Sequence, residues 1–219
     1  MARVLAVDVG LKTLTIATAS KTRDDEGVCV HSLQLFSILP DPVMCSKDEC
    51  KFKATKKIDG TMLCGRHSRG VSGMKVSQRK TTTFSFTEIV AFVRQTVESL
   101  DTTGITSVVI ELQPRVNNKM KFTSHVLFAF LATKCSTARV KFVSARRKLQ
   151  NFSGPINVLS KSKSKYTQRK KEGIHQIDWY LESNRFCNPE FVSGIVNKCT
   201  KKDDLCDTLL MVLDELKAK

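Results

Sequence analysis

The sequence predicts an α/β fold built on a mixed sheet flanked by helices, and two observations support this class. First, three extended segments rich in apolar and β-branched residues, 3–8, 14–19 and 28–39, follow one another across short connections, as antiparallel neighbours do. Second, helical and extended patterns alternate from residue 85 onward. At 219 residues the chain is long enough for one domain with a modest insertion.

The predicted elements have recognisable boundaries. A glycine-containing turn at 10–13 joins the first two strands, and Pro40 and Pro42 end the third. Ser85 and Glu88 form a capping box at the start of the first helix, whose apolar residues recur at helical spacing. The remaining elements are predicted as strands at 107–113 and 139–144 and as helices at 117–133, 166–183, 188–197 and from 203 to the end.

This order of elements is that of an RNase H-like fold, whose five-stranded sheet has the spatial order 3-2-1-4-5 with strands 4 and 5 parallel to strand 1. We therefore expect residues 1–219 to form a single RNase H-like nuclease domain. In this layout the first and fourth strands are neighbours, so Asp8 and Glu111 converge. A C-terminal helix laid across the sheet brings Asp204 and Asp207 to the same place.

The chemistry of these side chains predicts metal ions. A carboxylate within an apolar strand, such as Asp8, is costly to bury without a cationic partner, and four carboxylates cannot remain ionised together without cations. A pair of Mg²⁺ ions, with Mn²⁺ as the expected substitute, would clamp the attacking water and the leaving oxygen of an in-line phosphodiester cleavage. The expected metal ligands and catalytic residues are Asp8, Glu111, Asp204 and Asp207.

The charge of the chain predicts a polyanionic partner. Lysine and arginine outnumber aspartate and glutamate by 36 to 21, which gives a formal net charge of +15. Between Arg146 and Lys171 there are nine basic residues and no acidic one, so nucleic acid is favoured over an ordinary solvated basic surface. The residues expected to bind DNA are Arg115, Arg146, Arg147, Lys148, Lys161, Lys163, Lys165 and Arg169.

A group of cysteines and one histidine lies in residues 40–83, which have no sustained periodicity. Cys45 and Cys50 form one close pair, and Cys64 and His67 form a second. Two such pairs supply the four ligands of a structural zinc site, although the first spacing is looser than in a standard finger. We expect a zinc-binding insertion at residues 43–69, with reduced cysteines that are merely near one another as the alternative. The surrounding basic residues indicate that this insertion also contacts phosphates.

The sequence also predicts where the protein works. No apolar run approaches the roughly 20 residues of a membrane span, and the first residues do not have the order of a signal peptide. We therefore expect an intracellular protein with no membrane partner. In that setting the eight cysteines are expected to be thiols or metal ligands and not disulfides.

Four stretches resemble the successive motifs of the poxvirus-type Holliday junction resolvases, within the RuvC-like branch of the RNase H-like nucleases. They are AVDVGLK, VVIELQPR with the apolar helix and KFVS that follow it, YTQRKKEGIHQIDW, and KKDDLCDTLL. The resemblance implies a homodimeric, magnesium-dependent endonuclease that cuts four-way DNA junctions by paired nicks, with the four carboxylates as metal ligands. Lys170 and Lys171 match the family's basic pair and are the favoured auxiliary catalytic lysines, with Lys12 a weaker candidate.

The resemblance covers nearly the whole chain except residues 40–83, which those viral enzymes lack. It implies DNA recombination and repair as the process, and a viral replication site, the cytoplasm or the nucleus as the location. Paired cuts need two active sites, so a C2 homodimer is expected. The helix predicted at 117–133 is either its contact surface or part of the core.

Two alternatives stand beside a junction-resolving endonuclease. An RNase H-like nuclease acting on RNA–DNA hybrids or other branched DNA would have the same carboxylates, and a catalytically silent, zinc-containing DNA-binding protein would have the same charge. Actin-like and sugar-kinase-like ATPases also begin with a strand, an Asp-x-Gly turn and a hairpin. They need a second such domain, for which 219 residues leave no room.

Overall fold

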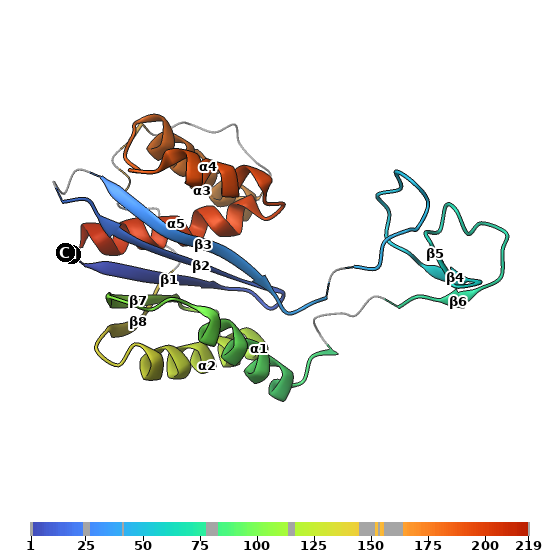
Figure 1. The fold of residues 1–219 in the computed structure, drawn as a ribbon. Helices are drawn as coiled ribbons and strands as arrows, with labels where there is room; N and C mark the ends of the chain where they lie inside the picture. Colours follow the sequence, from blue (N-terminus) through green and yellow to red (C-terminus); the bar gives the residue numbers. More distant parts are fainter. Residues whose placement is uncertain are drawn as a thin grey trace. The chain divides into compact units, whose positions relative to one another are not determined.

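A five-stranded mixed sheet forms the centre of the larger of two units (Figure 1). In spatial order its strands are β3 (Val28–Ser37), β2 (Thr13–Lys21), β1 (Arg3–Val9), β7 (Ile105–Glu111) and β8 (Arg139–Val143). β1 is antiparallel to β2 and parallel to β7, which is parallel to β8. The predicted strand order is therefore confirmed, since β7 and β8 are the fourth and fifth strands of this sheet.

The larger unit contains residues 1–36 and 86–219, and the smaller unit contains residues 37–85. The computed structural model describes residues 2–23, 27–40, 42–77, 83–113, 117–144, 152, 154–155 and 164–218.

Helices cover both faces of the large sheet (Figure 1). On one face, α3 (Lys165–Glu182), α4 (Pro189–Lys198) and α5 (Lys202–Lys217) form a single apolar cluster with the strands. On the other face, α1 (Phe86–Ser99) and α2 (Asn118–Lys134) pack against each other. From Leu205 to Leu216 every residue of α5 except Asp207 is buried, because the sheet lies on one side of this helix and α3 and α4 on the other.

The alternation of side chains along β1 determines the face on which Asp8 lies. Val4, Ala6 and Asp8 share one face of the strand, and the first two pack in the cluster that contains α5. At the opposite end of α5, the buried Glu215 accepts a hydrogen bond of 2.8 Å from Ser107 and pairs with Lys141 at 2.7 Å. The helix therefore crosses the sheet diagonally, with its first turn toward the end of β1 that carries Asp8.

The smaller unit contains three short strands where the sequence predicted no regular structure. They are β4 (Lys56–Ile58), β5 (Thr61–Leu63) and β6 (Met74–Lys75), in the antiparallel order β5-β4-β6. Asp59 and Gly60 connect β4 to β5 with φ angles of 46° and 83°. An Asp-Gly pair with this left-handed backbone is the preferred two-residue hairpin loop, so the local signal was present in the sequence.

The structure bears on the predicted state of the cysteines and on the search for membrane spans. Cys29 and Cys187 form a disulfide that ties β3 to the residues before α4, with the Cα atoms 5.1 Å apart, so the expectation of thiols or metal ligands is wrong for these two. The other six cysteines are free. Within the described residues, no helix is both long and apolar enough to cross a membrane.

Candidate functional site

Asp8 and Glu111 lie on adjacent parallel strands. The register of β1 and β7 pairs Val7 with Ile110, so the next residue of each strand, Asp8 and Glu111, extends the same row of neighbours. Both side chains are half-buried. Gln113 donates a hydrogen bond of 3.3 Å to Glu111 Oε2, which orients this carboxylate at the end of its strand.

Two buried threonines attach the first turn of α5 to the sheet beside Asp8. Thr15 is the partner of Asp8 on β2, and its hydroxyl donates to the Asp204 carbonyl oxygen at 3.3 Å. The Thr208 hydroxyl lies 2.7 Å from Thr15 Oγ1 and 2.9 Å from the same carbonyl. Asp204 is therefore held next to the strand position that carries Asp8.

Lys170 of α3 faces the acidic first turn of α5. Its ammonium group forms an ion pair with Asp203 and lies 3.6 Å from Asp204 Oδ1. Partial burial raises the pKa of Asp203, but the hydrogen bond and the charge of Lys170 outweigh it and hold this pKa below its ordinary value. The side chain of Lys170 is 26% exposed, so the pair is shielded from solvent.

Asp207 lies against the backbone of α3 at Gly173. A Cβ atom at Gly173 would stand 3.1 Å from Asp207 Oδ1, which is closer than such contacts normally are. A glycine inside a helix costs about 1 kcal/mol relative to alanine. Any larger residue at position 173 would therefore crowd the Asp207 carboxylate.

Asp8, Glu111, Asp204 and Asp207 thus come from two neighbouring strands and from the helix that crosses them. Their oxygens do not form a compact group: in the described part of the chain, the single set of three or more potential ligands within 4.8 Å of one another is the Cys/His cluster. Ionised carboxylates repel one another, and Asp203 and Asp204 of α5 pair with Lys170. Half-buried carboxylate oxygens are nevertheless the donors that a hard divalent cation requires, so the residues fit a cation of this class.

The other predicted residues have varied positions. Lys171 is exposed on α3, Lys12 is exposed in the turn between β1 and β2, and Arg169 is exposed on α3. Of Lys165, only its place at the start of α3 is described. The remaining predicted DNA contacts, Arg115, Arg146, Arg147, Lys148, Lys161 and Lys163, lie outside the described residues.

Sequence reasoning missed the supporting residues Thr15, Thr208 and Gly173. Asp203, which is not among the predicted site residues, is the ion-pair partner of Lys170. A glycine within an otherwise helical pattern signals a close approach, so Gly173 could have been found. The threonines carried no comparable signal, because a threonine is common in any strand.

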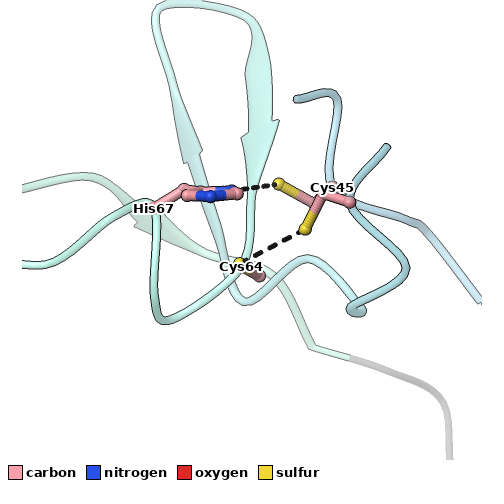
Figure 2. Close-up of side chains that lie close together, drawn as sticks. Cys45, Cys64 and His67 are labelled. Atoms are coloured by element: carbon pink, nitrogen blue, oxygen red, sulfur yellow. Dashed lines mark hydrogen bonds between the residues drawn. The ribbon is translucent and has the colours of Figure 1, made fainter. Parts of the chain in front are cut away.

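The four predicted zinc ligands lie together in the smaller unit. Figure 2 shows three of them, Cys45, Cys64 and His67, with their side chains directed toward one another. Cys45 Sγ is 3.3 Å from His67 Nδ1, and Cys50 Sγ is 3.9 Å from Cys64 Sγ. Tetrahedral coordination with Zn–S bonds of about 2.3 Å places two sulfur atoms about 3.8 Å apart. The Cys/His cluster, Cys45, Cys50, Cys64 and His67, could therefore hold zinc.

The loops around the cluster hold these side chains in place. Cys45 and Cys50 lie in the loop before β4, and Cys64 directly follows β5. Within that loop, the Cys45 N–H donates a hydrogen bond of 2.9 Å to the Phe52 carbonyl oxygen. Burial raises the pKa of the Cys45 thiol, but hydrogen bonds with His67 and with backbone groups outweigh it and lower this pKa to about 6. Cys45 therefore tends toward the thiolate, which is the form that binds metal.

Known proteins resemble this chain in structure and not in sequence. No protein-family model matches the sequence, and no curated protein matches it either. The structure of Thermus thermophilus RuvC matches with a TM-score of 0.51 and 11% identity, over 99% of this chain and 96% of the other. The Fowlpox virus resolvase, solved with its substrate Holliday junction DNA, matches with a TM-score of 0.50 and 15% identity, over 99% and 97%. The chain therefore has the fold of the RuvC-like resolvases, the fold that the sequence resemblance implied.

Proposed function

We propose that this protein is a metal-dependent endonuclease that resolves four-way DNA junctions by paired nicks. The observation that carries the proposal is the placement of Asp8, Glu111 and the acidic first turn of α5 at the same end of one sheet face. A chain with a net charge of +15 is suited to a DNA substrate. The similar Fowlpox virus protein, whose structure contains Holliday junction DNA, supports a branched substrate.

In this proposal Asp8, Glu111, Asp204 and Asp207 would hold two Mg²⁺ or Mn²⁺ ions. Bound metal would supply charge that stabilises the attacking and leaving oxygens at the phosphate. Thr15 and Thr208 keep Asp204 beside Asp8, and Gly173 leaves room for Asp207. Lys170 adds positive charge next to the acids, where it can stabilise the negative charge that develops on the phosphate.

We further propose that residues 43–69 bind a structural zinc ion through the Cys/His cluster. This insertion would interrupt a single nuclease domain that otherwise spans residues 1–219. The match of the sulfur separation to a tetrahedral site supports the assignment.

A C2 homodimer is also part of the proposal, because two coordinated cuts need two sites. Leu127 and Leu131 of α2 are fully buried, while Phe130 of the same helix is half-buried. α2 therefore has apolar surface beyond its core-facing side, which supports it as the contact surface. The proposed enzyme acts inside the cell, where its DNA substrate is found.

The decisive experiment compares three substrates, each with and without magnesium: a synthetic four-way junction, a linear duplex and an RNA–DNA hybrid. We expect symmetric nicks in the junction, only when magnesium is present. Cleavage of the hybrid without cleavage of the junction would favour another RNase H-like nuclease. Salt-sensitive binding without cleavage of any substrate would favour a silent DNA-binding protein.

Lys170 and Lys171 form a matched pair of variants. Lys170→Gln should lower the cleavage rate about 10²-fold, because it removes a charge beside the reacting phosphate, and should change junction affinity little. Lys171→Gln should weaken affinity modestly and leave the rate of bound substrate unchanged, since this side chain is exposed. Single-turnover cleavage and equilibrium binding separate the two effects, and equal rates for both variants would contradict the role of Lys170.

A further inference from the structure

The smaller unit carries a concentration of exposed apolar side chains. Eight large apolar side chains are exposed in the described part of the chain, and five of them belong to this unit. They are Val43, Met44, Phe52, Val71 and Met74. Exposed apolar groups gathered on a small unit indicate a binding surface, because leaving them in water costs free energy.

Phe52 is the most informative of these residues. Its backbone supports the Cys/His cluster, since its carbonyl accepts from the Cys45 N–H and its own N–H bonds to the Cys50 sulfur. Its ring, in contrast, is part of a side chain that is 60% exposed. Lys51 and Lys53 flank it and are exposed as well. The backbone of Phe52 is therefore held by the cluster, while its ring remains exposed and has a lysine on either side in the sequence.

The three-stranded sheet has the same combination of apolar and basic groups on its outer face. Leu63 and Ile58 pack with the cluster cysteines, so their face of the sheet points inward. Lys57 of β4 pairs with Met62 of β5 and with Met74 of β6. Side chains alternate between the two faces of a sheet, so these three residues lie on the outer face. Met74 is 74% exposed.

The positive charge of the smaller unit indicates an anionic partner. Residues 42–77 contain eight basic and three acidic side chains, so the partner is an anion. Phosphate groups suit the lysines, and the faces of unstacked bases suit an exposed phenylalanine and methionine. A fully stacked duplex offers phosphates but hides the faces of its bases, whereas a branch point or a gap offers both.

We propose that the smaller unit is a second DNA-binding site, selective for unstacked bases, in which Phe52 stacks on a base and Lys51 and Lys53 bind the adjacent phosphates. The choice of branched DNA as substrate rests on the proposed function. The selectivity for unstacked bases rests on the exposed surface of the unit itself.

The test measures the affinity of the full-length protein for a four-way junction, a gapped duplex and a fully paired duplex, without added magnesium. Phe52→Ala should weaken binding to the junction and to the gapped duplex by about 5- to 150-fold, because a stacked base is worth about 1–3 kcal/mol. Binding to the paired duplex should change less than about twofold. Phe52→Trp should retain the affinity, and zinc content confirms that each variant is folded.

Phe191→Ala is the matched control, because Phe191 is 42% exposed on α4 of the larger unit. Unchanged binding by Phe52→Ala, or equal losses on all three DNAs, would overturn the proposal. A lower sedimentation coefficient for Phe52→Ala than for the wild type, measured without DNA, would overturn the proposal and assign this surface to contacts between copies of the chain. If the wild type fails to cut junctions, the proposed function is wrong. The affinities of the wild type and of Phe52→Ala for the gapped duplex still test the role of Phe52.

Discussion

Asp8→Asn and Glu111→Gln should each lower the rate of junction cleavage by about 10³-fold or more. Metal ions supply several kcal/mol of charge stabilisation at a phosphate, and about 4 kcal/mol corresponds to a factor of 10³ in rate. Each variant removes the charge of a proposed metal ligand from the row that β1 and β7 create. Single-turnover cleavage at saturating protein concentration, over a range of magnesium concentrations, measures the loss.

These variants should still bind the junction. Their affinity without magnesium should equal or exceed that of the wild type, because every basic residue of the chain is retained and one negative charge is gone. Their folds should be preserved, since both side chains are half-buried and the substitutions conserve size. Glu182→Gln is the control, because Glu182 is exposed at the end of α3. A variant of Asp8 or Glu111 that cut as fast as this control would not have lost a metal ligand.

Cys64→Ser should abolish zinc binding and the ordered structure of residues 37–85. Structural zinc contributes roughly 10–16 kcal/mol in zinc-finger peptides, whereas the smaller unit has few other buried groups to hold it together. Native mass spectrometry should find about one zinc per wild-type chain and none in the variant. Limited proteolysis should cut the variant within the smaller unit.

The larger unit should withstand this change, because its core is separate from the Cys/His cluster. The thermal unfolding of the larger unit should therefore be nearly the same for Cys64→Ser and the wild type. Cys199→Ser, which removes a free thiol of the larger unit, should keep its zinc. A zinc-free wild-type preparation that resisted proteolysis within residues 37–85 would refute a structural role for the metal.

The large sheet was predictable because its signals are local and strong. Apolar runs, the capping box and the polar connections identify the elements, and the rules for connecting them leave few topologies. The short strands of the smaller unit were missed because two or three residues are too few to show a period. The Asp59-Gly60 pair was a stronger signal for this hairpin, because the preference of Asp-Gly for a two-residue turn depends only on local backbone conformation.

The Cys29–Cys187 disulfide was missed for a different reason. Its cysteines are 158 residues apart in the sequence, and pairing over such a distance cannot be deduced from spacing. The cluster cysteines lie in two close pairs, which is a pattern that spacing does reveal. Cysteine positions therefore predicted the local site and not the long-range bond.

The sequence by itself determined the strand order, the placement of Asp8 and Glu111 at neighbouring strand ends, and the grouping of the four potential zinc ligands. Each of these follows from patterns within a few residues combined with general rules of connection. Only the tertiary structure decided that Lys170 and not Lys171 faces the acids of α5, that Thr15 and Thr208 anchor this helix, and that Gly173 makes room for Asp207. These contacts join segments 33 to 193 residues apart, and their geometry depends on how helices pack on the sheet, which no local pattern encodes.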